Sequence, residues 1–430
     1  MFDSLPFQLP PITVLPFVAM LLAIAFAPLV IKHHWERSYH LLSIGLGGIT
    51  IFYYGIVLKN WQRIGHVAHE YLSFVALIGS LFVVAGGIHI VVKGEAKPWI
   101  NGVYLFLGAI VSNLIGTTGA SMLLVRPWIR MNRYRFTGLH TVFFIFIVSN
   151  AGGCLTPIGD PPLFLGFLKG VPFWWVLEHC WKAWLVVVLG LLVIFYVADR
   201  FNFSKAPREV RARETAHETW KCSGLHNLVF LAVILGSVFL QSPPGLRELL
   251  MLGAGIASYC TTPRQTHKAN EFTFTPIKEV AWLFAGIFAT MMPALDYLEA
   301  HAHRLGLHSE MQFYWFTGAL SGVLDNAPTY LTFLAGAFGL AGLNIDDPAH
   351  MQSFIAHHGH HLEAISLGAV FFGAMTYIGN GPNLMVKSIV EAAGVKTPGF
   401  FGYMFKYSLP VLVPFFWIIS LLFFSSHRIF

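Results

Sequence analysis

The sequence predicts an all-α polytopic membrane protein made of two inverted repeats, each with five spans, one re-entrant hairpin and a helix broken at the membrane midplane. The composition is the first reason. Of the 430 residues, 56% are apolar and 11% are charged, whereas soluble proteins carry about 25% charged residues. The second reason is that long apolar stretches recur along the chain, and the third is a motif that occurs once in each half. A water-soluble globular protein is excluded, and a lipid bilayer is the expected environment.

The apolar stretches define the expected spans. A helix needs about 20 largely apolar residues to cross the hydrocarbon core. Such stretches run over 12–31, 40–58, 71–92, 139–168, 173–198, 225–241, 245–261, 280–298, 364–390 and 404–425. The first lacks the basic start and cleavage site of a signal peptide, so we expect it to be a retained span. Two further stretches, 99–125 and 311–340, have Gly, Asn, Thr or Pro at their centres and are interpreted as re-entrant hairpins.

The polar segment 199–224 divides the chain into a first repeat, 1–198, and a second repeat, 225–430. We expect this segment to be a cytoplasmic linker. With both termini on the outer side, most of the 27 Lys and Arg residues fall on the cytoplasmic side, as the positive-inside rule requires. The helical spans predict the cell (inner) membrane.

A short motif is repeated in the two halves. Residues 155–163 read LTPIGDPPL and residues 375–384 read MTYIGNGPNL. Aligned without a gap, Thr156 meets Thr376, Gly159 meets Gly379, and Asp160 meets Asn380. Each motif lies in a stretch interpreted as a broken helix, 139–168 or 364–390, downstream of a predicted hairpin. An odd number of spans in each half makes the repeat inverted and brings the hairpin tips together at the midplane. This architecture is typical of secondary transporters.

Two acidic residues, Asp160 and Asp325, lie in the interior of apolar stretches beside Gly, Pro and Asn. An ionisable group at such a depth is costly and indicates a functional site. One carboxylate that holds either H⁺ or Na⁺ is sufficient chemistry for cation exchange. The alternative is structural, with each carboxylate capping the N-terminus of a half-helix.

Neighbouring polar groups and glycines complete the predicted ion or substrate site. They are Ser112, Asn113, Thr117, Thr118, Asn150, Thr156, Gly159, Asn326, Thr376, Gly379, Asn380 and Asn383. Within this set and the two carboxylates, the expected Na⁺ ligands are Asp160, Asn113, Thr156, Asp325, Asn326 and Thr376. The same groups could also hold a carboxylate or oxyanion at half-helix N-termini. We expect no bound cofactor, and Na⁺ and H⁺ as transported or coupling ions.

These residues resemble the ion transporter superfamily, in particular the NhaD-type Na⁺/H⁺ antiporters, the arsenite permeases and the CitMHS-like citrate transporters. The most specific segments are SNAGGCLTPIGDPP (149–162) and SGVLDNAPTYLTF (321–333). The resemblance implies that Asp160, and Asp325 with Asn326, match positions that bind cations and protons. It also implies a homodimer in which a scaffold supports a mobile, elevator-like transport domain carrying both hairpins.

Two departures bear on the substrate. NhaD-type antiporters tend to carry Asp-Asn in the first hairpin, where this chain has Ser112-Asn113. In addition, GDPP (159–162) and NGPN (380–383) are similar to elements of di- and tricarboxylate carriers. The leading interpretation is Na⁺/H⁺ antiport, because no Lys or Arg lies well inside the hairpins or broken helices to offset the carboxylates. The alternative is Na⁺- or H⁺-coupled transport of citrate or a dicarboxylate, followed by arsenite or another anion.

Other classes of function have little support. A zinc protease needs HExxH on a helix, but after His69-Glu70 the position of the second His is Ser73. GxSxG and Walker A motifs are absent, so we expect no enzyme activity and no ATP-driven pump. The four cysteines show no CxxC spacing, and nucleic acid is not an expected partner. The run HHGHH (357–361) is expected to lie in a solvated outer loop, with metal binding or pH sensing as alternatives.

Overall fold

The computed structural model describes residues 9–91, 97–205, 221–240 and 242–425. In these ranges, eight helices are long and apolar enough to cross a membrane. The sheet described there is one antiparallel pair of short strands, β1 (His89–Val91) and β2 (Lys221–Ser223), with His89 opposite Ser223. The protein is therefore an all-α polytopic membrane protein, as the composition predicts.

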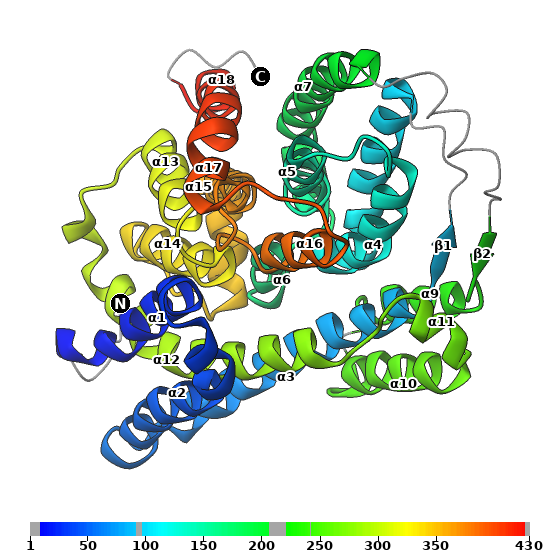
Figure 1. Cartoon of the computed structure of the whole chain (residues 1–430). Helices are drawn as coiled ribbons and strands as arrows, with labels where there is room; N and C mark the ends of the chain where they lie inside the picture. The colour runs from blue at the N-terminus through cyan, green and yellow to red at the C-terminus, as the bar shows by residue number, and fades with distance from the viewer. Residues whose placement is uncertain (1–8, 92–96, 206–220, 241, 426–430) are drawn as a thin grey trace.

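Two groups of helices make up the molecule (Figure 1). The first helix group lies in the lower part of the view, where α12 packs on α2 and α3, and α3 packs on α9 and α10. Its elements are η1 (Pro11–Val14), α1 (Leu15–Val30), α2 (Lys32–Phe52), the π-helix η2 (Tyr53–Val57), α3 (Trp61–Gly86), α9 (Asn227–Ser237), α10 (Leu246–Thr261), α11 (Arg264–Ala269), α12 (Thr275–His301) and η4 (Ala302–Leu305).

The second helix group lies above the first and contains both interrupted regions of the sequence (Figure 1). Its elements are α4 (Pro98–Met131), α5 (Gly138–Ile147), η3 (Ala151–Leu155), α6 (Pro161–Leu168), α7 (Trp175–Lys205), α13 (Glu310–Ser321), α14 (Asn326–Leu340), α15 (Pro348–Phe372), η5 (Gly373–Met375), α16 (Gly381–Ala392), α17 (Phe400–Tyr403), the π-helix η6 (Met404–Leu412) and α18 (Val413–Phe423). The two groups meet where α3 contacts α4 and where α12 contacts α14.

Helix α4 is two half-helices that meet at Gly116. Gly116 has φ 76° and ψ 155°, a conformation that a residue without Cβ adopts at no steric cost. The two arms lie side by side, because Tyr104 Oη donates to the Leu124 carbonyl at 2.7 Å and Asn101 Nδ2 donates to Asn132 Oδ1 at 2.8 Å. The predicted hairpin 99–125 thus has its tip at Gly116, and its second arm continues to Met131, beyond the predicted end at residue 125.

Helices α13 and α14 form a second helical hairpin. The helical run stops at Ser321 and restarts at Asn326, and the rings of Phe313 and Phe333 make an edge-to-face contact between the two arms. A capping box closes the start of α13, where Ser309 Oγ accepts from the Gln312 backbone N–H. This hairpin corresponds to the predicted 311–340.

The two predicted broken helices share one local design. In each, an α-helix gives way to a 3₁₀ turn and an extended Thr before the next α-helix starts, at Pro161 in one and Gly381 in the other. A Cβ on Gly159 would overlap the carbonyl of Gly153, and one on Gly379 would overlap the carbonyl of Gly373. The glycines of the repeated motif are therefore required by close backbone approach.

Several element boundaries differ from the predictions. The expected span 245–261 corresponds to α10, of 16 residues, whereas the expected span 225–241 corresponds to the shorter helix α9, of 11 residues. Helix α2 begins at Lys32 instead of residue 40, and α3 begins at Trp61 instead of residue 71, because their polar first turns are helical too. Helix α7 continues to Lys205, and residues 206–220 of the predicted linker lie outside the described residues.

The prediction that His357–His361 form a loop was wrong. These residues belong to α15, which starts at Pro348. The Asp347 side chain caps this start by accepting from the Ala349 backbone N–H at 2.8 Å, and Pro at the first helical position has a φ that is already helical. A change in backbone angles at His358 bends the helix there.

Candidate functional site

The carboxylate of Asp160 is the centre of a buried polar cluster. Asp160 directly precedes α6 and is 1% exposed. Its Oδ1 accepts from Thr117 Oγ1 at 2.7 Å and from Asn380 Nδ2 at 3.0 Å, and its Oδ2 accepts from Asn326 Nδ2 at 2.6 Å. These donors come from the tip of the first hairpin, the start of α16 and the start of α14. Four separate segments of the chain thus meet at one carboxylate.

No positive charge compensates this carboxylate directly. Among the described residues, no Lys, Arg or His forms an ion pair with Asp160, and its three donors are neutral. Asn326, which donates to Asp160 through Nδ2, has a second polar atom, Oδ1, that is buried and has no hydrogen-bond partner. An unpaired buried oxygen is costly, and a carboxylate beside a free amide oxygen is an arrangement that suits a cation.

A chain of side-chain amides connects the two broken helices. Asn150 Nδ2 donates to Asn383 Oδ1 at 2.7 Å, and Asn380 Nδ2 lies 3.2 Å from Asn150 Oδ1. Asn383 Nδ2 in turn donates to the carbonyls of Gly373 and Thr376. These amides satisfy backbone carbonyls that the helix breaks leave without a helical partner.

The other predicted ligands bond mainly to the backbone. The Thr156 hydroxyl donates to the Asn113 carbonyl at 2.6 Å and accepts from the Gly159 N–H at 3.1 Å, and Thr376 Oγ1 accepts from the Gly379 N–H at 3.1 Å. Asn113 Nδ2 donates to the Gly152 carbonyl at 2.6 Å, and Ser112 Oγ donates to the Val148 carbonyl at 2.7 Å. These four side chains hold the first hairpin and the breaks in position around Asp160.

Asp325, unlike Asp160, caps a helix. It is half-buried, and its Oδ1 accepts from the Ala327 backbone N–H at 3.0 Å, so it caps α14. This is the structural alternative that the sequence left open for both aspartates. The Asp160 side chain makes no such cap hydrogen bond. Asp325 reaches the cluster through its neighbour Asn326, which bonds to Asp160 directly.

A cavity of about 30 Å³ lies beside Asp160. Its walls come from the first hairpin tip (Gly116–Gly119, which includes Thr118), the break (Pro157–Pro161) and the apolar face of α3. A water molecule needs at least about 10–15 Å³ of such volume. The cavity therefore has room for an ion or one or two waters.

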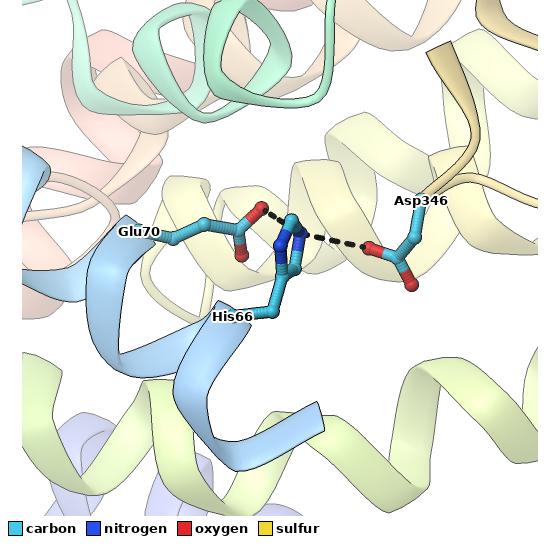
Figure 2. Close-up of side chains that lie close together, drawn as sticks. All are labelled: His66, Glu70 and Asp346. Carbon is cyan, nitrogen blue, oxygen red and sulfur yellow. Dashed lines mark ion pairs between the residues drawn. The ribbon is translucent and has the colours of Figure 1, made fainter. Parts of the chain in front are cut away.

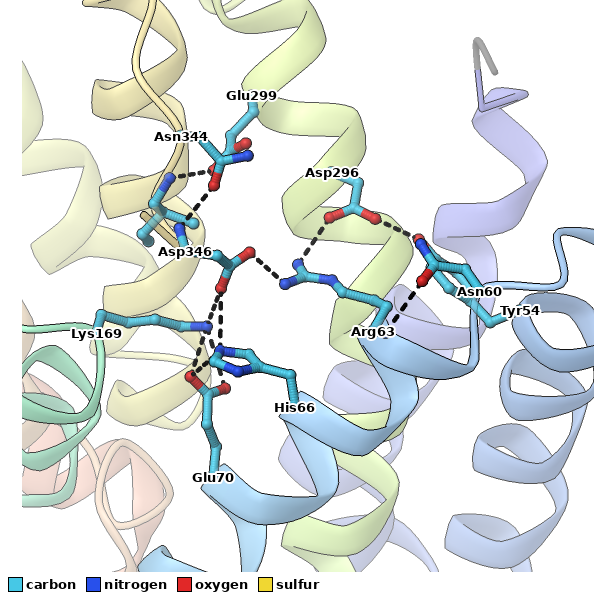
Figure 3. A network of polar contacts seen from close by, with 11 residues as sticks. Tyr54, Asn60, Arg63, His66, Glu70, Lys169, Asp296, Glu299, Asn344 and Asp346 are labelled. Carbon is cyan, nitrogen blue, oxygen red and sulfur yellow. Dashed lines mark hydrogen bonds and ion pairs between the residues drawn. The ribbon is translucent and has the colours of Figure 1, made fainter. Parts of the chain in front are cut away.

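Two buried charge clusters were missed by the sequence analysis. At one, Asp199 near the end of α7 is fully buried and pairs with Arg135 and His140. At the other, Lys169 Nζ lies 2.8 Å from Glu70 Oε1 and 2.6 Å from Asp346 Oδ1, and Arg63 pairs with Asp346 and Asp296 (Figure 3). The sequence places these residues near the ends of spans, where charges are usually solvated.

Comparison with known proteins places the chain in a family. Residues 7–424 match the family model CitMHS_2, which is described as "Putative citrate transport". The chain belongs to the CitMHS_2 family. This agrees with the predicted relationship to the ion transporter superfamily.

Similar proteins occur in mycobacteria. The chain is 26% identical over 266 residues to a 46 kDa membrane protein of Mycobacterium leprae, a match that spans 57% of this chain and 58% of that protein. It is 24% identical over 319 residues to uncharacterized transporters of Mycobacterium bovis and Mycobacterium tuberculosis, covering 70% of this chain and 72% of each relative. The family and these relatives together indicate a membrane transporter.

Proposed function

We propose that this CitMHS_2 protein is a secondary active transporter that exchanges Na⁺ for H⁺ at Asp160. The observation that carries the proposal is the environment of this carboxylate. It is buried, it forms no ion pair with a basic residue in the described parts of the chain, and it lies next to the unpaired amide oxygen of Asn326. A group in this position is stabilised by binding a cation or a proton.

The side-chain amides suit both forms of the carboxylate. In the structure, the NH₂ groups of Asn326 and Asn380 donate to the bare carboxylate. An amide also carries an oxygen that accepts hydrogen bonds. When a proton or Na⁺ occupies Asp160, a rotation of either amide brings its oxygen to the proton or the ion. A single site can thus hold H⁺ or Na⁺ in turn, which is the requirement for exchange.

The arrangement of helices supports an elevator-type movement. The hairpins, the broken helices and Asp160 all belong to the second helix group, and the first helix group borders it through the α3–α4 and α12–α14 contacts. In the proposed mechanism the first group is the scaffold and the second group carries the ion across the membrane. Two inverted repeats and a homodimer are part of this proposal.

A second candidate is Na⁺- or H⁺-coupled transport of citrate or a dicarboxylate. The description of the matched family favours it. In that case Asp160 would bind the coupling cation, and the organic anion would enter only after the site opens. The cavity of about 30 Å³ and the absence of a basic residue paired with Asp160 in the described residues favour the small cation.

Transport by the purified protein in liposomes that contain a pH-sensitive dye distinguishes the two candidates. Na⁺, Li⁺, K⁺, citrate and succinate are added separately. Antiport predicts a change in internal pH on addition of a cation without any organic anion. Na⁺-dependent accumulation of labelled citrate or succinate, with no response to the cation alone, would contradict it and favour the second candidate.

A further inference from the structure

Three side chains that can ligate a metal, those of His66, Glu70 and Asp346, lie together near the start of α3 (Figure 2). His66 and Glu70 are four residues apart on α3, so they share one face of that helix. Asp346 comes from the segment between α14 and α15. His66 Nε2 lies 3.2 Å from Glu70 Oε1 and 3.7 Å from Asp346 Oδ1, and one ligand atom from each residue lies within 4.8 Å of the others.

These separations fit a metal ion. Zn²⁺ binds His nitrogen and carboxylate oxygen at about 2.0–2.2 Å with tetrahedral geometry, which puts neighbouring ligand atoms about 3.3 Å apart. The distances from His66 Nε2 to Glu70 Oε1 and Asp346 Oδ1, 3.2 and 3.7 Å, bracket this value. The ligand set of one imidazole and two carboxylates suits divalent first-row transition metals.

The site has an excess of negative charge. Three carboxylates, those of Glu70, Asp296 and Asp346, surround two permanent cations, Arg63 and Lys169 (Figure 3). Burial raises the pKa of Asp346, but the charges of Lys169 and Arg63 outweigh it and hold this pKa at about 2.

A cation already occupies the space between the ligands. The Lys169 ammonium lies 2.8 Å from Glu70 Oε1 and 2.6 Å from Asp346 Oδ1, so it contacts the two oxygens that a metal would need. The Lys169 ammonium and a metal ion cannot both be bound there.

We propose that His66, Glu70 and Asp346 form a binding site for a divalent transition-metal ion, which displaces the ammonium of Lys169. The ion has a route to the site, because the His66 side chain is 47% exposed and borders a polar cavity of about 350 Å³. Water in this cavity supplies the fourth ligand. Lys169 sets the affinity of the site, since the metal has to replace its ion pairs.

Metal binding would also affect movement. His66 and Glu70 belong to α3 in the first helix group, whereas Asp346 belongs to the second helix group. A metal ion that joins them holds the two groups in the arrangement seen here and slows transport. This consequence rests on the proposed elevator movement, but the binding of the metal does not.

Calorimetric titration of the purified full-length protein with Zn²⁺ tests the site. His66→Ala removes a ligand and is expected to weaken binding at this site at least about tenfold. Lys169→Met removes the competing charge and is expected to strengthen binding. A merely structural role of Lys169 would not produce this opposite change. His357→Ala alters an exposed histidine of α15 and serves as the control for unspecific binding to the histidine-rich helix.

Equal Zn²⁺ affinity of the wild type and His66→Ala would overturn the proposal, and so would weaker binding by Lys169→Met. If Lys169→Met does not yield folded protein, the unfolding temperature of the wild type and His66→Ala with and without Zn²⁺ decides the question. Zn²⁺ should raise it in the wild type and much less in His66→Ala. Neither result depends on transport, so failure of the metal site and failure of antiport are distinguishable.

Discussion

At the scale of single residues, the central feature is a carboxylate that receives hydrogen bonds from three distant segments. The motif around Asp160 and the Asp325-Asn326 pair could be recognised from the sequence, because ionisable and amide groups inside apolar stretches need a reason to be there. The partners could not be recognised. The sequence alone does not show that Asn326 and Asn380 donate hydrogen bonds to Asp160, or that Asp325 accepts one from the backbone of its own helix.

The glycines of the repeated motif give the first prediction. A Cβ on Gly159 would overlap the Gly153 carbonyl, whereas one on Gly102 in α4 meets nothing within 4 Å. Gly159→Ala is expected to destabilise the protein by about 1–3 kcal/mol through overpacking. Gly102→Ala is expected to stabilise it by about 0.5–1 kcal/mol, as in other helix interiors. Thermal unfolding in detergent measures both, and an equal effect of the two substitutions would refute the close approach of the backbones.

At the scale of elements, helix interruptions were easier to predict than helix ends. Gly, Pro and Asn in apolar stretches located both hairpins and both breaks. The sequence analysis did not predict that the polar first turns of α3 and α15 are helical, because charged residues and histidines at the end of an apolar stretch are typical of a solvated loop. In the structure, Glu70 is buried against Lys169, and Asp347-Pro348 is a helix start that capping rules could have identified.

The buried pair at the end of α7 gives the second prediction. Asp199 accepts from Asn101 Nδ2 at 2.8 Å and pairs with Arg135, so it joins α4, α7 and the segment before α5. Removing one partner leaves a buried charge without compensation, which costs about 3–5 kcal/mol. Asp199→Ala is thus expected to lower the unfolding temperature strongly.

Arg126→Ala is the matched control, because its partner Glu271 is 75% exposed and a pair of this kind contributes about 0–1 kcal/mol. Thermal unfolding of both variants gives the comparison. A similar loss in both would mean that the Asp199 cluster does not hold these helices together.

At the scale of the whole molecule, the distribution of Lys and Arg predicts which charged segments lie on each side of the membrane. Arg63, Lys169 and Asp346 gather at one end, while Arg126, Glu271 and the β1–β2 pair belong to segments that the prediction places on the other side. Which face lies inside the cell stays a prediction, because it rests on the distribution of Lys and Arg alone.

Native cysteines test the orientation without any substitution. Cys222 and Cys260 are exposed, whereas Cys154 and Cys180 are buried. If the segment 199–224 and the end of α10 are cytoplasmic, a membrane-impermeant maleimide labels Cys222 and Cys260 in inverted membrane vesicles and not in intact cells. Arg304→Cys, on the opposite side, should become labelled in intact cells. The reverse pattern would invert the predicted topology.

The most direct test of Na⁺/H⁺ exchange at Asp160 compares Asp160→Asn with Asp347→Asn in liposomes that report internal pH. Asp347 is an exposed carboxylate that caps α15, so its substitution makes the same chemical change outside the site. We expect Asp160→Asn to fold and to lose the cation-driven pH change completely, while Asp347→Asn retains it. Persistent exchange in folded Asp160→Asn would contradict the assignment of this carboxylate as the exchange site.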